Sequence, residues 1–219
     1  MLTVDPDSLA TLDSRQCRLA LLDGPAFAPL ETHRRSIAAR FGPTPHVDPL
    51  DGGVDATLLL LLETPGPRGE APRFVSRDNP TGTARNLRHF LSASGIERRQ
   101  SLLWNAVPWI IHAPGARNRA PTRPEAEMGL SLLSDFVSLL PALRVVVTAG
   151  RTAALAHPLL RTARPDLELF AMPHPSPVYV NTSPSVAERI TAALDAASGC
   201  LAVAASEESE TPRGRPPTD

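Results

Sequence analysis

Three polar side chains stand directly behind short apolar segments, and they are the groups with which this chain could do chemistry. Glu63 follows five consecutive leucines, Asn105 follows Ser101–Trp104, and His174 lies just beyond Leu167–Met172. A carboxylate can orient a water molecule, an amide can donate and accept hydrogen bonds, and an imidazole can donate one. These groups can act together only if the fold brings them to one place.

The apolar segments are the elements that must position these side chains. Five leucines are too few to span a bilayer, and such a run is typical of a strand buried on both faces. Predicted helices at Thr83–Ser94 and Pro124–Leu140 separate successive strands, and Leu143–Thr148 brings the number of strands to four. The pattern predicts a three-layer α/β/α sandwich with a short, mostly parallel four-stranded sheet. The carboxyl ends of its strands would surround one crevice with the three polar side chains.

The chain length of 219 residues, with 42% hydrophobic and 21% charged residues, favours one globular domain with terminal extensions. Residues 1–53 are predicted to form a helical extension packed on the domain, and residues 54–200 the α/β domain itself. Residues 201–219 are predicted to be a disordered tail. We expect a monomer.

The distribution of apolar, charged and cysteine residues excludes several classes of protein. No apolar run is long enough for a membrane span, and the first residues include acids where a signal peptide would carry basic ones. A cytoplasmic location is therefore expected. Cys17 and Cys200 are too few for a cysteine-ligated cluster or a four-cysteine zinc site, so we expect neither a metal nor a cofactor.

The basic residues, all of them arginine, are unevenly spread. Between Arg68 and Arg123, ten arginines stand against three acidic residues, a local balance of +7 in a chain of formal net charge −1. This asymmetry indicates a polyanionic partner near the first two loops, and a solvated arginine-rich surface is the simpler alternative.

The motifs at the strand ends, taken in order, resemble those of the uracil-DNA glycosylase superfamily. Glu63–Gly66 (ETPG) is similar to the GEAPG loop of the iron-sulfur branch, and LLWNAVPW is similar to the strand that ends in Asn-Ala-Val. His174–Pro177 (HPSP) resembles the loop that enters the DNA minor groove, and Pro72–Val75 (PRFV) resembles the segment with the base-stacking phenylalanine. The resemblance covers roughly Val54–Ala197.

The resemblance implies excision of uracil from DNA by hydrolysis of the N-glycosidic bond, which leaves an abasic site without any covalent intermediate. Asn105 would read the edge of a flipped-out base, and His174 would donate to the base oxygen O2, where negative charge accumulates. Glu63 is the candidate for orienting the water and stabilising the sugar cation. The remaining substrate-binding candidates are Thr64, Pro65, Gly66, Phe74 (base stacking), Ser176 (phosphate binding) and Tyr179 or Val178 (insertion into the base stack).

Departures from the family pattern keep other functions open. Strict uracil enzymes have an aspartate where this chain has Thr64 and a tyrosine where it has Gly66, and the cysteines of the iron-sulfur branch are missing. The alternatives are a glycosylase for another deaminated base, such as hypoxanthine, and a DNA-binding member without catalysis. An unrelated nucleotide-binding α/β enzyme would carry GxGxxG or GxxxxGK[ST] after a strand, and this chain carries neither.

Each candidate residue also has a purely structural interpretation. Asn105 could cap the turn after its strand, His174 could be a rigid loop residue between two prolines, and Phe74 could be a core anchor. Glu63 could cap a helix or pair with Arg151. The functional interpretation depends on the expectation that the three polar side chains lie at the same sheet edge.

Overall fold

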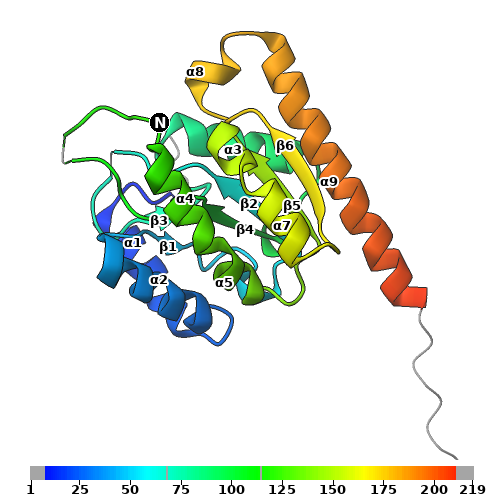
Figure 1. Cartoon of the computed structure of the whole chain (residues 1–219), viewed down its shortest axis with the longest axis horizontal. Coiled ribbons are helices and arrows are strands. Elements are labelled where there is room, and N and C mark those ends of the chain that lie inside the picture. Colours follow the sequence, from blue (N-terminus) through cyan, green and yellow to red (C-terminus); the bar gives the residue numbers. More distant parts are fainter. Residues whose placement is uncertain (1–7, 68, 114, 211–219) are drawn as a thin grey trace, which may run out of the picture.

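The computed structural model describes residues 8–67, 69–113 and 115–210, and its centre is a four-stranded parallel sheet (Figure 1). The strands are β2 (Leu58–Leu62), β4 (Ser101–Asn105), β5 (Val145–Ala149) and β6 (Glu168–Met172). Their order in the sheet is β4-β2-β5-β6, and every neighbouring pair is parallel. The predicted α/β fold with a short parallel sheet is confirmed.

The leucine run forms an inner strand because both of its edges and both of its faces are covered. Leu58 to Leu61 are fully buried, and β2 pairs with β4 on one side and β5 on the other. On one face, Trp104 of β4 stacks on Phe136 with ring centroids 4.5 Å apart. β6 is one of the two edge strands, and most of its residues are at least partly exposed. Parallel register brings the carboxyl ends of the strands to one edge of the sheet.

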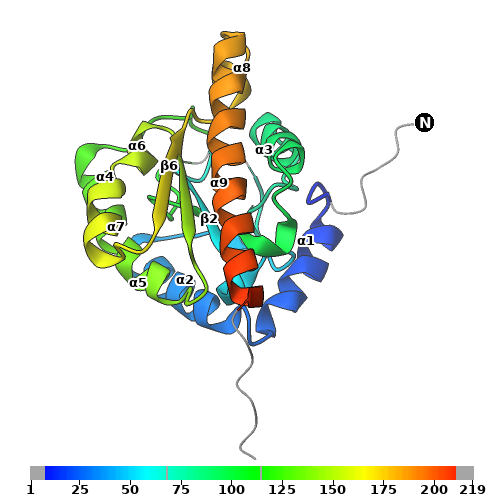
Figure 2. The ribbon, with the colours of Figure 1, turned by 90° about the vertical axis from the view of Figure 1, so that its right-hand side faces the viewer.

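Two layers of helices enclose the sheet (Figures 1 and 2). One face is covered by α3 (Gly82–Ala93) and α9 (Pro184–Glu210), and the other by α4 (Arg123–Ser131), α5 (Leu133–Ser138) and α7 (His157–Ala163). The sequence predicted one helix at Pro124–Leu140, but the structure divides it at Leu132 into α4 and α5. The segment after β5 forms two short helices, α6 (Arg151–Ala154) and α7, because Pro158 lacks an amide hydrogen and suits a helix start.

The N-terminal segment wraps the β4 side of the sheet and shares its hydrophobic core. Its elements are α1 (Leu12–Leu19), the 3₁₀ turn η1 (Ala20–Asp23), α2 (Ala28–Phe41) and β1 (His46–Val47). The short strand β1 pairs in parallel with β3 (Phe74–Val75), a strand that the sequence analysis did not predict. Leu9, Leu30 and Ile37 are buried in the main core.

The remaining elements are short turns and the C-terminal helix. They comprise η2 (Gly53–Asp55), η3 (Arg98–Gln100), the single-turn helix α8 (Pro177–Val180) and α9. α9 continues to Glu210, so residues 201–210 are helical where the sequence predicted a disordered tail, and residues 211–219 lie outside the described residues. Alanine, leucine and glutamate, which are strong helix formers, explain the extension. Within the described ranges, no helix is long and apolar enough to cross a membrane.

A buried group of ion pairs joins the N-terminal segment to the rest of the fold. We call it the ionic cluster, and it consists of Arg18, Asp48, Asp51, Arg77, Asp78, Arg88 and Arg98. Its three carboxylates are no more than 2% exposed, although they come from separate stretches of the chain. Buried carboxylates of like charge are tolerated only when cations and hydrogen bonds compensate them.

The contacts within the ionic cluster are short. Arg18 lies 2.6 Å from Asp48 and 3.1 Å from Asp78, and Arg98 lies 2.8 Å and 2.7 Å from the same two carboxylates. The hydroxyl group of Ser76 also donates to Asp48. The cluster therefore fixes α1, the segment after β1, the segment after β3 and η3 to one another.

Asp51 is the carboxylate of the ionic cluster whose charge is least completely compensated. Its Oδ1 lies 3.1 Å from Arg98, while its buried Oδ2 has no hydrogen-bond partner among the described residues. Burial raises the pKa of Asp51 to about 7, against the lowering effect of Arg77 and Arg98. In the unfolded chain the same carboxyl has a pKa near 3.8. Between these values the folded protein binds the additional proton, so stability falls as pH rises.

Replacing Asp51 by Asn should remove this dependence. The free energy of unfolding of the parent protein, measured relative to Asp51→Asn, should fall between about pH 4 and pH 7 by up to about 1.4 kcal/mol per pH unit. Urea denaturation of both proteins at several pH values provides the measurement. Asp55→Asn, at an exposed acid nearby, is the matched control. A constant difference between parent and Asp51→Asn across this range would contradict the assignment.

Candidate active site

The first and second motifs meet at the carboxyl edge of the sheet. Leu62 and Asn105 are paired in register as the last residues of β2 and β4. Beyond them, the amide of Ala106 donates to the Leu62 carbonyl at 2.8 Å and the amide of Val107 donates to the Glu63 carbonyl at 3.0 Å. The loops that carry Glu63 and Asn105 are therefore joined directly by backbone hydrogen bonds.

Glu63 reaches across to the loop after β5. Its Oε1 accepts a hydrogen bond from the Thr152 amide at 2.8 Å, at the start of α6. The close approach requires a glycine at position 150, because a Cβ there would lie 2.7 Å from the Glu63 carboxyl carbon. Gly150 also has a φ of 98°, which favours glycine. The helix-cap interpretation of Glu63 is thus correct in part, whereas the hydrogen bond goes to Thr152 rather than to Arg151.

His174 follows β6 and lies within electrostatic reach of Glu63. Burial lowers the pKa of His174, and the Glu63 carboxylate acts in the opposite direction. The imidazole is therefore neutral near pH 7, in the state that donates one hydrogen bond and accepts another. Its ring forms no hydrogen bond with any residue in the described ranges.

Asn105 lies at the same edge of the sheet, as the last residue of β4. The residue is only 3% exposed, yet its side-chain amide has no hydrogen-bond partner among residues 8–67, 69–113 and 115–210. A turn cap would show such a bond. The Asn105 amide atoms are not among the fully buried polar atoms that lack a partner, so the amide is unpaired but open to a ligand.

The HPSP loop is held from α3. The side chain of Asn86 donates to the Pro175 carbonyl at 2.9 Å, and a Cβ at Gly82 would lie 2.4 Å from the Pro177 ring. Ser176 precedes α8, and its hydroxyl makes no cap hydrogen bond. Tyr179 on α8 is 50% exposed, so α8 presents apolar surface to solvent.

The other predicted substrate-binding residues have different surroundings. Thr64 is half-buried, Pro65 is buried, and Gly66 is exposed, with its carbonyl accepting from Arg73 at 2.6 Å. Phe74 is 5% exposed and packs against His46 with ring centroids 5.4 Å apart. These contacts of Phe74 are those of a core residue.

His112 is a residue that the sequence analysis missed. Its ring is buried close to the Pro65 carbonyl, and neither ring nitrogen has a hydrogen bond of regular geometry within the described chain. Burial, together with Arg119 and Arg73, lowers the pKa of His112. A single histidine in a loop carries no sequence signal, so only the fold places it beside the first motif.

The arginine-rich stretch is only partly available to a polyanion. Arg77 and Arg98 belong to the ionic cluster, and Arg119 pairs with Glu125 at 2.7 Å. The sequence could not separate these internal cations from exposed ones. The local excess of arginine therefore overstates the charge offered to a partner.

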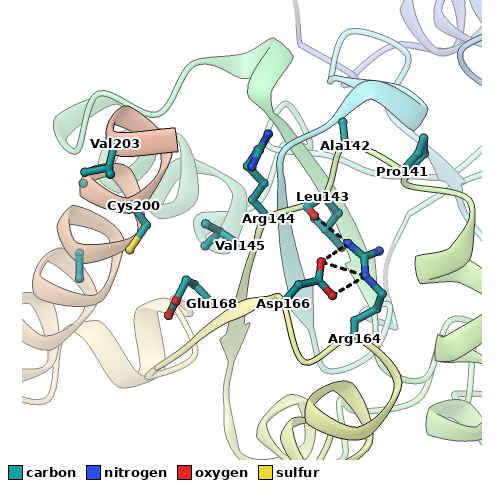
Figure 3. A pocket seen from close by; sticks show the side chains of 12 residues that line it. Pro141, Ala142, Leu143, Arg144, Val145, Arg164, Asp166, Glu168, Cys200 and Val203 are labelled. Atoms are coloured by element: carbon teal, nitrogen blue, oxygen red, sulfur yellow. Dashed lines mark hydrogen bonds and ion pairs between the residues drawn. The ribbon is translucent and has the colours of Figure 1, made fainter. Parts of the chain in front are cut away.

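A separate hollow of about 650 Å³ lies at the amino ends of β5 and β6 (Figure 3). Arg164 donates to the Leu143 carbonyl at 3.0 Å and pairs with Asp166 at 2.7 Å along one wall. Cys200 and Val203 of α9 line the opposite wall. This hollow is at the other end of the strands from the three candidate catalytic residues and takes no part in their site.

Comparison with known proteins identifies the family of the chain. The family model of the uracil DNA glycosylase superfamily matches residues 52–197, which is more than half of the chain. The chain belongs to the uracil DNA glycosylase superfamily. Its members act on DNA as glycosylases.

Among solved structures, the chain is similar to SMUG2 from Pedobacter heparinus, with a TM-score of 0.46 and 10% sequence identity. The similarity covers 69% of this chain and 77% of the SMUG2 chain. No curated protein matches the chain in sequence. The family assignment therefore depends on the family model.

The contact between Gly150 and Glu63 gives a sharp test of the site. Gly150→Ala would place a methyl group on the Glu63 carboxylate and strain the backbone, so Glu63 should lose its hydrogen bond to Thr152. We expect base excision to fall by at least about tenfold, since a misplaced catalytic group is inefficient. Single-turnover excision assays on the folded variant measure this. Gly199→Ala, at a glycine with open space around it, is the control, and equal rates for Gly150→Ala and the parent would contradict the role of Glu63.

Proposed function

We propose that this protein is a monofunctional uracil-DNA glycosylase, which hydrolyses the N-glycosidic bond of uracil in DNA and leaves an abasic site. The observation that carries the proposal is the unpaired amide of buried Asn105 at the same sheet edge as Glu63 and His174. An amide, a neutral imidazole and a carboxylate match the charges of this reaction, in which a base anion and a sugar cation develop together.

Base recognition is assigned to Asn105. A flipped-out uracil exposes a carbonyl oxygen and an N–H group on its Watson–Crick edge, and one amide can donate to the first and accept from the second. Because Asn105 ends a buried strand, its backbone cannot shift to accommodate another pattern. An amide covered by the bound base discriminates strongly, since a base with the wrong edge leaves it unpaired.

His174 and Glu63 stabilise the opposite charges that develop on the base and on the sugar. The neutral imidazole of His174 donates a hydrogen bond to the base oxygen O2 as the bond breaks and the electron pair leaves with the base. Glu63 stabilises the sugar cation and orients the water that attacks the sugar carbon, and the carboxylate takes up the proton of that water. The hydrogen bond from the Thr152 amide holds the Glu63 carboxylate in place.

A second substrate class has one specific observation in its favour. A Cβ built on Gly66 meets no atom within 4 Å, so the first motif leaves open space where strict uracil enzymes carry a tyrosine. A larger deaminated base such as hypoxanthine would have room there. The same three residues would serve its excision, with Asn105 reading the corresponding edge.

A substrate panel tests the proposal and separates the two classes. Labelled oligonucleotides with uracil, hypoxanthine, xanthine or thymine, single-stranded and opposite each base, are treated with protein and then with alkali, which cleaves at abasic sites. We expect uracil to be excised fastest. Faster excision of hypoxanthine would favour the second class, and no excision of any base would refute both.

His174→Ala should lower single-turnover excision by roughly 10²–10³-fold, which is the cost of one donor to a developing anion. DNA affinity should change little, because the imidazole contributes mainly in the transition state. His174→Gln retains a side-chain donor and should recover part of the rate. If His174→Ala weakened binding and rate equally, the residue would be a structural part of the loop.

Asn105→Asp replaces the amide donor with an ionised acceptor of the same shape. Uracil excision should then fall by orders of magnitude, and weak excision of unpaired cytosine should appear, because a carboxylate matches the amino group of that base. Both bases are measured in the same oligonucleotide, with Asn105→Ala as the control for simple loss of contact. Parental uracil excision by Asn105→Asp would show that Asn105 does not read the base.

A further inference from the structure

One face of α3 connects the HPSP loop to exposed cationic side chains. Gly82, Arg85, Asn86 and His89 are spaced at i, i+3, i+4 and i+7, so they lie along one face of the helix. Gly82 and Asn86 contact the HPSP loop through Pro177 and Pro175, as described above. Arg85 and His89 therefore continue the same face beyond the loop and α8.

Unlike most arginines between Arg68 and Arg123, Arg85 has a side chain that is available to bind a partner. It is exposed and forms no ion pair with any residue in the described ranges, unlike Arg98, Arg119 and Arg123. A guanidinium group that is solvated and without an internal carboxylate is a ready partner for phosphate, which it can bind through two hydrogen bonds.

The surface around Arg85 is open and only shallowly indented. A depression of about 520 Å³ is lined by Arg85, Arg88, His89, Ser92 and Ala93. Arg88 has a half-exposed side chain, and it contributes positive charge to the depression while it also contacts Asp78. The residues from Arg85 to Ser92 span about 10 Å along the helix, which is the axial rise of about three nucleotides.

We propose that this face of α3 binds phosphates of the DNA strand beside the flipped nucleotide. The exposed residues Val178 and Tyr179 on α8 would occupy the gap in the base stack, and the strand leaving that gap would pass onto Arg85 and His89. The guanidinium of Arg85 contributes charge, whereas His89 and Ser92 contribute hydrogen-bond donors. The inference rests on the proposed function only in requiring that the ligand is DNA.

The experiment measures DNA binding rather than excision. A fluorescein-labelled duplex with one central abasic-site analogue is titrated with protein at several salt concentrations and followed by anisotropy. Arg85→Gln should reduce the slope of log affinity against log salt by about 0.9 and weaken binding roughly 5- to 10-fold at 0.1 M salt. Arg85→Glu should weaken it further. The loss should be the same for different flanking sequences, because phosphate contacts carry no base specificity.

Matched controls separate the possible outcomes. Arg35→Gln changes an exposed arginine of α2 that has no ion pair within the described chain, and it should leave slope and affinity unchanged. Parental binding by Arg85→Gln, or equal losses in Arg85→Gln and Arg35→Gln, would overturn the inference. Parent protein that binds no DNA would overturn it as well. If the parent excises no base but Arg85→Gln still lowers the salt slope, the proposed function fails and the phosphate-binding face stands.

Discussion

Three carboxylates buried in one place impose the constraint on which the fold depends. Asp48, Asp51 and Asp78 are each no more than 2% exposed, and without compensation their mutual repulsion and desolvation would cost several kcal/mol. Arg18 and Arg98 provide compensation from α1 and η3, which are far apart in sequence. The N-terminal segment is therefore part of the charge balance of the domain as well as of its core.

Helix α3 connects the ionic cluster to the candidate active site. Arg88 joins α3 to Asp78, and one half-turn earlier Asn86 holds the carbonyl of the HPSP loop. The loop with His174 thus rests on a helix that is itself fixed to buried charges. The candidate catalytic groups follow the ends of buried strands, and α3 supports the loop that carries His174. Such backing is what holds a polar site in position before substrate arrives.

The sequence was most informative where a pattern has a local cause. The leucine run and three further apolar segments predicted the parallel strands, and strand-end geometry predicted that Glu63 and Asn105 would be neighbours. Two-residue strands such as β1 and β3 have no periodicity to detect, so no strand was predicted at Phe74. The role of Arg77 could not be foreseen either, because composition does not distinguish a buried ion pair from a surface charge. Long-range contacts decide both.

The contact of Glu63 with the α6 start also limits how this site could be altered by evolution or design. Position 150 tolerates no side chain while a glutamate reaches Thr152, and an aspartate at position 63 would be too short to accept from that amide. Changes at positions 63 and 150 must therefore occur together or in a particular order. A library that varies either position alone would sample mostly proteins in which this contact is lost, whereas paired variation would reach other side chains at position 63.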